Sequence, residues 1–375
     1  MKISRSKKIA VIGYLCLDLF PDLSGGCGLD FVPGMLREIG PCAAFPGGVV
    51  GNTGVALHRL GMPVKLAGRV GNDVFGHSIR DYFLRLSPAY AEHLKVDGNG
   101  GHTGYCIVLS PAGSDRMFLA YRGINDALTM ADAGNGFLDD AMLLHFGYPP
   151  LCRSFADARG RELRTLFTHA NDNDIITSLD MSLPSPGTFS YELDWMAFLR
   201  NVLPATDIFL PSMDELMFML KPQQGGSHAE LLRTMAEQLL GLGAAVVAIK
   251  LGKDGLYVKT TRDLHRLKRL AVTGADPAAW LDRELLAPCY HVEVAGTTGA
   301  GDATIAGFLA GVMSGAAIGQ TSLLAVGTGA SSVSAHDAVS GIRPLAELQS
   351  MIAVGWTQRS ISFNTGNIQI LGGSF

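Results

Sequence analysis

One short stretch, Val294–Asp302, constrains the fold of this chain more than any other. It reads Val-Ala-Gly-Thr-Thr-Gly-Ala-Gly-Asp, follows a β-like run at Tyr290–Val294 and precedes a long apolar run from Ala303. A strand, a turn of small residues and a helix start together collect backbone N–H groups around an anion. Glycine also lets a chain approach a ligand closely. The candidate anion-binding N–H groups are therefore those of Gly299, Ala300 and Gly301.

Asp302 ends this stretch, where the helix is expected to begin. Beside a phosphate, a carboxylate can accept the proton of an attacking hydroxyl group. An ordinary helix N-cap is the alternative, and the residue alone does not decide between the two. The stretch is not a P-loop, because no Gly-Lys-Ser/Thr follows the glycines. The pattern therefore favours an anion site with a candidate base beside it.

The segment Thr297–Leu309 resembles the C-terminal signature of the PfkB (ribokinase-like) carbohydrate kinases. The resemblance implies that Asp302 is the catalytic base and that the backbone of residues 299–301 forms an anion hole. One position departs from the family pattern, since Gly296 stands where the family commonly has Asp. In relatives that potassium activates, that Asp helps to bind the cation. We therefore expect little or no activation by potassium.

A second segment, Gly47–Gly76, resembles the N-terminal signature of the same family. The matching positions are Gly47, Gly48, Asn52, Gly61, Gly68, Gly71, Asp73 and Gly76. Val50 departs from the pattern, because a smaller residue is more usual there. Two signatures in the right order, far apart in the chain, are much harder to obtain by chance than one.

Composition argues against several classes of partner. The 375 residues are 47% hydrophobic, which supplies ample core, and their net charge of −4 does not suggest a nucleic-acid surface. The six cysteines include no Cys-x-x-Cys pair, so we expect a reducing compartment and no zinc site. The N-terminus lacks the apolar region of a signal peptide, so we expect a cytoplasmic location.

The apolar run after Asp302 raises the question of a membrane helix. No charged residue occurs from Ala303 to Ala335, and Gly307, Gly311 and Gly315 are spaced by four, as in packed membrane helices. Gly315 and the polar residues after it interrupt the run before it reaches about twenty residues. We therefore expect two helices packed closely on a sheet, and no membrane partner.

Alternating β-like and helical segments predict an α/β fold with a mostly parallel central sheet and helices on both faces. The expected strands are Lys8–Gly13, Val64–Val70, Leu143–Phe146, Ile175–Asp180, Ile208–Leu210 and Ala244–Leu251. The expected helices are Thr53–Leu60, Val74–Leu86 and segments near 153–171, 190–202, 213–220 and 228–242. Residues 260–289 look like a loop-rich insertion that contains Trp280, and residues 357–375 show no clear periodicity. The resemblance implies one ribokinase-like domain over 1–375, with the adenine near 260–289.

Two alternating runs, Thr103–Ser110 and Arg116–Tyr121, are joined by a turn-like segment and predict a hairpin. The resemblance implies that strands from about 14–46 and 101–126 form a small sheet that covers the substrate as a lid. It also leaves open a homodimer formed through this lid.

The resemblance implies ATP and Mg²⁺ as cofactors. The family's Asn-x-x-Glu motif corresponds to Ser212 and Glu215, so Glu215 is the expected residue for magnesium, with a first-turn helix acid as its alternative role. Lys250 stands where the family usually has Thr; it could pair with phosphate or simply face solvent. The expected nucleotide-binding residues are Ser212, Lys250, Gly252, Gly255, Thr297, Thr298, Gly299 and Gly301.

The acceptor site is expected at the other signature. Carboxylate and amide side chains can hydrogen-bond neighbouring hydroxyl groups, and paired glycines let a sugar approach the backbone. The expected substrate-binding residues are Asp18, Gly47, Gly48, Asn52, Tyr105, Arg116, Asn125 and Asp302. His145 and Asp180 lie at predicted strand ends, and we expect structural roles for both.

The combined pattern predicts an ATP-dependent kinase that phosphorylates a hydroxyl group of a sugar or sugar-like substrate. A nucleoside kinase of the same fold is one alternative. A non-catalytic sugar or nucleotide sensor is another, because Ser212 and Gly296 depart from the family pattern.

Overall fold

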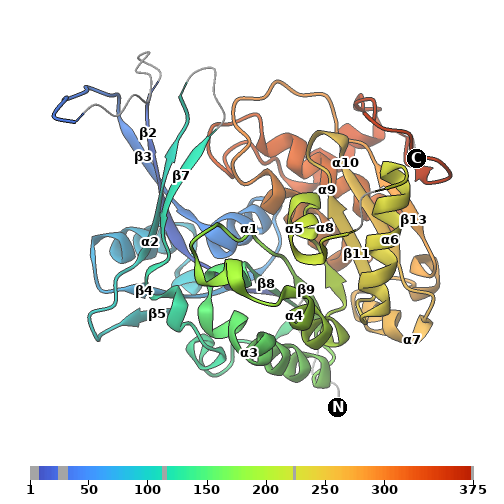
Figure 1. The fold of residues 1–375 in the computed structure, drawn as a ribbon, viewed down its shortest axis with the longest axis horizontal. Coiled ribbons are helices and arrows are strands. Elements are labelled where there is room, and N and C mark those ends of the chain that lie inside the picture. The colour runs from blue at the N-terminus through green and yellow to red at the C-terminus, as the bar shows by residue number, and fades with distance from the viewer. Residues whose placement is uncertain (1–7, 24–32, 112–115, 223–224, 373–375) are drawn as a thin grey trace.

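The computed structural model describes residues 8–23, 33–111, 116–222 and 225–372, which form two β-sheets and the helices around them (Figure 1). The larger sheet has ten strands in the order β14-β13-β12-β11-β10-β9-β8-β1-β4-β5. Their bounds are β1 Lys8–Gly13, β4 Val64–Gly71, β5 His93–Asp97, β8 Ala141–Gly147, β9 Ile176–Leu179, β10 Ile208–Phe209, β11 Val246–Lys250, β12 Leu256–Thr260, β13 Glu284–Ala287 and β14 Gln369–Ile370.

The prediction of a mostly parallel sheet is confirmed. All neighbouring pairs from β5 through β11 are parallel, and only the pairs that β12 makes with β11 and β13 are antiparallel. The helices are α1 Gly48–Arg59, α2 Val74–Leu86, α3 Arg153–Asp172, α4 Trp195–Val202, α5 Met213–Leu220, α6 His228–Gly241, α7 Leu264–Leu267, α8 Ala300–Met313, α9 Ile318–Ser332 and α10 Leu345–Ala353.

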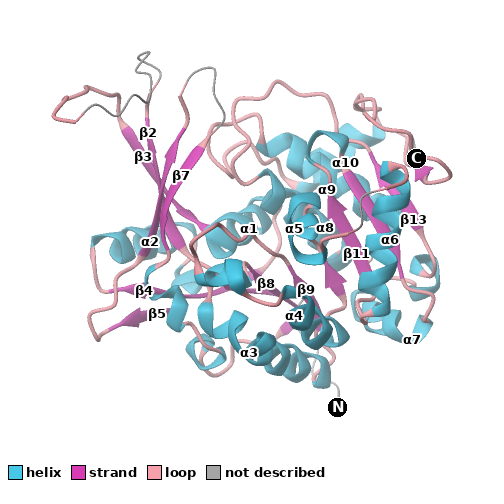
Figure 2. Cartoon of the chain, viewed as in Figure 1, coloured by secondary structure: helices cyan, strands magenta, loops and turns pink. Residues whose placement is uncertain are grey.

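Helices cover both faces of this sheet (Figure 2). Alternate residues of a strand point to opposite faces, and in β1 the side chains of Ile9 and Val11 belong to the core cluster that also contains residues of α1, α8 and α9. Those of Ala10 and Ile12 belong to the cluster on the other face, which contains residues of α3, α4 and α6. A parallel sheet buried on both faces needs near-continuous apolar strands, which is the pattern that β1 and β8 have.

The uncharged run after Asp302 forms α8 and α9, two closely packed helices, as expected. A Cβ atom on Gly307 would lie 2.4 Å from Thr328 Oγ1, and one on Gly311 would lie 2.9 Å from the Cα atom of Thr321. These glycines therefore set the close approach of the two helices. Among the described residues, no helix is long and apolar enough to cross a membrane.

The smaller sheet has the order β3-β2-β6-β7 and extends from the main body as an arm (Figure 1). Its strands are β2 Cys16–Pro21, β3 Cys42–Gly47, β6 Gly104–Leu109 and β7 Met117–Tyr121. They match the lid segments expected near 14–46 and 101–126, although residues 24–32 and 112–115 lie outside the described residues. We call this sheet the lid below.

Several sequence expectations need correction. The segment 260–289 is not only loop, because it contains β13 inside the main sheet, and Trp280 is fully buried against Phe308. The helix expected at Thr53 begins at Gly48, and the α-helix expected near 190–202 begins only at Trp195. Strands β2, β3, β5, β12 and β14 were not predicted individually, because each has six residues or fewer and several lie next to loops rich in glycine or proline.

Candidate active site

A cavity of about 750 Å³ lies where the carboxyl ends of the central strands meet the lid and the start of α8. Ligands of open α/β sheets bind at this edge. The cavity brings together most residues that the sequence analysis selected: Asp18, Gly48, Asn52, Arg116, Ser212, Glu215, Lys250, Gly252, Thr297, Thr298, Gly299, Ala300, Gly301 and Asp302. Two signatures about 250 residues apart thus line one site.

The first turn of α8 faces this cavity. Gly299 is its N-cap, with a left-handed φ of 71°, and a Cβ atom there would lie 2.3 Å from the Cβ of Ala338. Only glycine fits such a position without strain. The first N–H groups of a helix have no partner within it, and the helix dipole adds partial positive charge. Gly301 is exposed to the cavity, so this turn can bind an anion.

Asp302 is almost fully buried, and its carboxylate accepts three side-chain hydrogen bonds. Thr53 donates to Oδ1 at 2.9 Å, while Asn52 and the Tyr148 hydroxyl group donate to Oδ2 at 3.1 and 2.8 Å. Burial raises the pKa of Asp302 above its ordinary value, against the opposing effects of the Tyr148 hydrogen bond and the nearby Lys250 charge. Because Gly299 is the N-cap of α8, the alternative of an ordinary N-cap aspartate is wrong.

Lys250 lies at the end of β11, beside the anion-binding turn. Its Nζ atom is 2.6 Å from Asp180 Oδ1, and its side chain is only 12% exposed, which excludes the alternative of a solvent-facing lysine. A Cβ atom on Gly301 would be 3.9 Å from that Nζ atom. Burial lowers the pKa of Lys250, but the surrounding carboxylates of Asp180, Glu215 and Asp302 raise it more, so the ammonium group stays charged.

Asp180 and His145 were both expected to be structural. Asp180 lines the cavity and binds Lys250, so it belongs to the site as well as to the fold. His145 is fully buried, its Nδ1 atom lies 3.0 Å from the Ser178 hydroxyl group, and burial lowers its pKa to about 3. A neutral buried histidine with a hydroxyl partner fits the structural role.

Ser212 and Glu215 form a capping box at the start of α5. The Ser212 N–H donates to Glu215 Oε2 at 2.6 Å, and the Glu215 N–H donates to Ser212 Oγ at 3.3 Å. The helix-end role considered for Glu215 is therefore real. The residue also lines the cavity, so the same carboxylate can face a bound nucleotide.

The end of the cavity where the sequence analysis expected the acceptor, called the acceptor end below, is formed by α1 and the lid. Asp18, on β2, accepts a hydrogen bond from the Cys16 thiol at 3.1 Å, and burial raises its pKa to about 6. A Cβ atom on Gly47 would lie 2.0 Å from Asp18 Oδ2, so Gly47 makes room for this carboxylate and does not line the cavity. Gly48 has a φ of 72°, and a Cβ there would lie 2.4 Å from the carbonyl oxygen of Tyr14.

Three other expected site residues lie outside the cavity. Asn125 is fully buried, and its carboxamide bonds to the Leu15 N–H, the Leu15 carbonyl and the Arg122 carbonyl at 2.7–2.9 Å. Its role is therefore to tie the lid to the main body, which corrects the expected substrate contact. Gly255 forms the β11–β12 turn, where a Cβ would lie 2.0 Å from the Ala287 carbonyl oxygen, so it too is structural.

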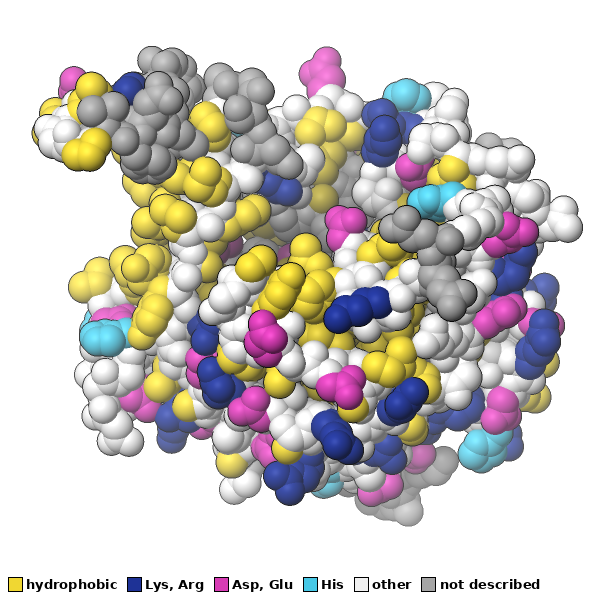
Figure 3. Space-filling view, viewed as in Figure 1, with side chains coloured by type: hydrophobic (Ala, Val, Ile, Leu, Met, Phe, Trp, Pro, Cys, Tyr) yellow, Lys and Arg dark blue, Asp and Glu magenta, His cyan; other side chains and the backbone are white. Residues whose placement is uncertain are grey.

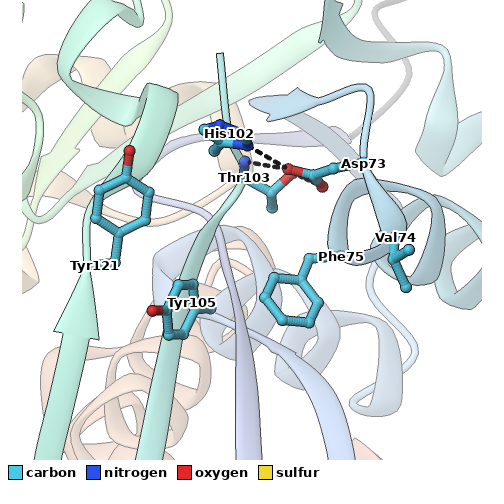
Figure 4. A pocket seen from close by; sticks show the side chains of 7 residues that line it. All are labelled: Asp73, Val74, Phe75, His102, Thr103, Tyr105 and Tyr121. Carbon is cyan, nitrogen blue, oxygen red and sulfur yellow. Dashed lines mark hydrogen bonds and ion pairs between the residues drawn. The ribbon is translucent and has the colours of Figure 1, made fainter. Parts of the chain in front are cut away.

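Tyr105 is the third correction. In β6 the side chains of Cys106 and Val108 face the main cavity, so Tyr105 points to the opposite face of the lid. There it lines a separate pocket of about 440 Å³ with Phe75 and Tyr121 (Figure 4). Arg116 is different, because it lines the main cavity and donates to Thr298 Oγ1 at 3.0 Å, which joins the lid to the anion loop.

Sequence reasoning missed Tyr148 and Thr53, both of which bind Asp302. Thr53 lies within the N-terminal signature, next to Asn52, and this position could have indicated that it belongs to the site. Tyr148 directly follows β8 and precedes two prolines. A polar aromatic residue at the carboxyl end of a buried strand was the signal that could have indicated it.

Comparison with known proteins agrees with this geometry. The model of the pfkB family carbohydrate kinases matches residues 6–344. An uncharacterized sugar kinase of Archaeoglobus fulgidus is 25% identical over 261 residues, which cover 70% of this chain and 87% of the relative. A probable fructokinase-4 of Arabidopsis thaliana is 25% identical over 319 residues, which cover 82% of this chain and 84% of the relative.

Solved structures with this fold include the ribokinase of Thermotoga maritima, with a TM-score of 0.66 and 16% identity over 92% of this chain and 99% of that one. A putative ribokinase II of E. coli in complex with ATP and Mg²⁺ has a TM-score of 0.67 and 20% identity, again over 92% of this chain and 99% of that one. The nucleoside kinase of Methanocaldococcus jannaschii has a TM-score of 0.64 and 17% identity over 92% of this chain and 98% of that one. At these identities the structures establish the ribokinase fold. With the family model matched over most of its length, the chain belongs to the pfkB family of carbohydrate kinases.

Proposed function

We propose that this protein transfers the γ-phosphoryl group of ATP to a hydroxyl group of a small sugar or sugar-like acceptor. One observation carries the proposal. The buried Asp302 carboxylate lies in the first turn of α8, between the anion-binding N–H groups and the side chains of the acceptor end. A base at that boundary can reach the hydroxyl that attacks a bound phosphate.

In this mechanism the acceptor oxygen attacks the γ-phosphorus atom, and Asp302 takes the hydroxyl proton. The bond to the bridging oxygen breaks, and ADP leaves. The N–H groups of Gly299 and Gly301 and the Lys250 ammonium group are the proposed donors to the phosphoryl oxygens, where negative charge must be stabilised. The Ala300 N–H donates to the Thr297 carbonyl at 3.3 Å in this structure, so it can join them only when that contact opens. Asp180 keeps Lys250 in position through their ion pair.

The nucleotide end is formed by Ser212, Gly252, Thr297 and Thr298. For Mg²⁺, the carboxylates that face this end belong to Glu215, Asp214 and Asp180, and they fit an ion that takes one or two carboxylates together with phosphate and water. Mg²⁺ bound there would neutralise phosphate charge, and Glu215 is the residue proposed to hold it. The putative ribokinase II of E. coli, which has this fold, was solved with ATP and Mg²⁺.

A nucleoside acceptor is the second candidate. The acceptor end is lined by Tyr14, Val108, Phe118 and Ala120 and by few polar side chains, which suits an acceptor with an apolar or aromatic part. A non-catalytic sensor is less well supported, because Asp302, Lys250 and the anion-binding turn are all in place.

The experiment is ATP turnover with Mg²⁺ across a panel of pentoses, hexoses, keto sugars and nucleosides, with the phosphorylated product identified by mass spectrometry. Acceptor-dependent formation of ADP and a phosphorylated product is the expected result. Binding of a sugar without any ADP release across the panel would support the sensor and refute the kinase.

A dimer formed through the lid also remains a proposal. The outer side of β7 exposes Met117, Leu119 and Tyr121, each more than 40% accessible, and apolar side chains gather on this arm (Figure 3). Light scattering of the wild type and of Leu119→Asp tests it. A dimer that this substitution dissociates is expected, and a wild-type monomer would refute it.

A further inference from the structure

The side chain that contacts the candidate base most closely, Tyr148, belongs to neither family signature. Its hydroxyl group lies 2.8 Å from Asp302 Oδ2, closer than the Asn52 and Thr53 donors, and it lines the main cavity. Burial and the neighbouring Asp302 carboxylate raise the pKa of Tyr148 well above its ordinary value. The phenol therefore stays protonated and can only donate to the carboxylate.

The backbone of Tyr148 shows that this contact depends on an unusual conformation. The residue has φ 64° and ψ 50°, the left-handed region that bulky residues rarely adopt, and it precedes Pro149. Such conformations cluster at functional sites and persist only where the surrounding structure fixes them. Here the ring lies beside Tyr14, with ring centroids 6.4 Å apart, and the backbone N–H approaches the Asp180 carbonyl.

These contacts leave the Asp302 carboxylate with few free hydrogen-bond acceptor positions. A carboxylate offers about four acceptor positions on its two oxygens. Thr53 uses one on Oδ1, whereas Asn52 and Tyr148 use both on Oδ2. One position on Oδ1 therefore remains for a reacting hydroxyl group, and Oδ2 has none for a water molecule.

We propose that Tyr148 is a positioning residue that closes Oδ2 of Asp302 to water, so that the base activates the acceptor hydroxyl and ATP is not hydrolysed. This inference rests on the proposed kinase function. Without the phenol, a water molecule can bind Oδ2 and give its proton to the carboxylate. Its oxygen then bonds to the γ-phosphorus atom as the bond to the bridging oxygen breaks, which yields ADP and inorganic phosphate.

The test is Tyr148→Phe, which removes only the hydroxyl group. Hydrolysis of ATP without acceptor, divided by the rate of acceptor phosphorylation, should rise at least about tenfold, which is the lower end of the effect of one hydrogen bond to a charged group. Tyr90→Phe is the matched control, because the hydroxyl group of this buried tyrosine also has a side-chain partner, the partly buried His58, but Tyr90 does not line the cavity. That control should leave the ratio unchanged, and thermal unfolding should show that both variants fold.

Two further measurements separate this role from a purely structural one. Loss of the Tyr148 donor should raise the pKa of Asp302, so the acid limb of kcat/KM should move to higher pH. The other charged groups that interact with Asp302, which are Lys250, Asp18 and Asp180, are unchanged in this variant, as is Glu215, which interacts with Lys250 and Asp180. In Tyr148→Phe/Asp302→Asn the added hydrolysis should disappear, because the base that activates water is gone.

The proposal requires the higher hydrolysis ratio, the shifted acid limb and the loss of the added hydrolysis in the double variant. An unchanged hydrolysis ratio in Tyr148→Phe, an acid limb that does not move, or added hydrolysis that survives Asp302→Asn would each overturn the proposal. These outcomes leave the kinase function intact whenever the wild type phosphorylates an acceptor. A wild type that phosphorylates no acceptor in the panel would instead refute the proposed function, and this inference with it.

Discussion

The two ends of the main cavity are built in different ways. The phosphate end consists of short contiguous segments, the first turn of α8, the Ser212–Glu215 capping box and the end of β11. The acceptor end joins segments that are far apart in sequence, such as Asn52 and Asp302, and it depends on the lid. Local sequence motifs are therefore enough to identify the residues of the phosphate end, whereas tertiary packing decides which residues line the acceptor end.

The corrections follow this division. Every expected nucleotide-binding residue except Gly255 lines the cavity, but no residue of 260–289, the segment expected near the adenine, does so. At the acceptor end, Gly47, Tyr105 and Asn125 do not line it. If the comparison is right, substitutions at the phosphate end should lower the rate of transfer, whereas substitutions at the acceptor end should mainly weaken acceptor binding.

The largest effect is expected for Asp302→Asn. Loss of a positioned base should lower kcat by about 10²–10⁴-fold, while ATP binding persists because the N–H groups of the turn remain. Steady-state kinetics and ATP titration calorimetry measure the two quantities. A variant that keeps turnover within a few-fold of the wild type would show that Asp302 is not the base.

Lys250→Met tests the phosphate end while Asp302 itself is unchanged. Removing the ammonium group should lower kcat by about 10²-fold, as for other groups that stabilise transition-state charge, with little change in the KM for the acceptor. Lys65→Met is the matched control, since Lys65 is also ion-paired but lies toward the amino end of β4. A larger change in acceptor KM than in kcat would contradict the division between the two ends.

Asp18→Ala tests the acceptor end. Each lost hydrogen bond to a charged group is worth about 1.5–3 kcal/mol, so acceptor binding should weaken far more than ATP binding. Calorimetry with each ligand separates the two. Equal losses for both ligands would indicate a folding defect and not a lost contact.

The pH dependence of acceptor binding extends this test. Burial raises the pKa of Asp18 to about 6, so the side chain becomes protonated as the pH falls through 6 and then accepts fewer hydrogen bonds. The dissociation constant of the acceptor should therefore increase below pH 6 in the wild type. The same increase in Asp18→Ala would assign the pH dependence to another group.

The smallest effect concerns potassium at the anion loop. Gly296 has no carboxylate, and a Cβ there would lie 2.9 and 3.0 Å from the His336 and Ala335 carbonyl oxygens, so the loop has no room for a side chain without a shift. Exchange of potassium for a large organic cation at fixed ionic strength should change turnover by less than about tenfold, or about 1.4 kcal/mol. A greater rise with potassium would reveal a replacement ligand.

The fold was largely predictable because its signals are local. Val74–Leu86 and Met213–Leu220 form helices at the predicted bounds, since each begins at a side chain that caps it, Asp73 and Ser212. Strand β13 was not predictable in this way. Its four residues carry too little periodicity, and its place in the sheet comes from pairing with β12.

The sequence by itself determined the candidate anion-binding turn, the candidate base beside it and the α/β class, because glycine conformation, helix start and apolar periodicity act over a few residues. Only the tertiary structure decided which side of the lid Tyr105 faces, that Asn125 bonds to backbone, and that Tyr148 reaches Asp302 across 154 positions. Side-chain direction and long-range contact arise from strand register and packing, which no short stretch of sequence contains.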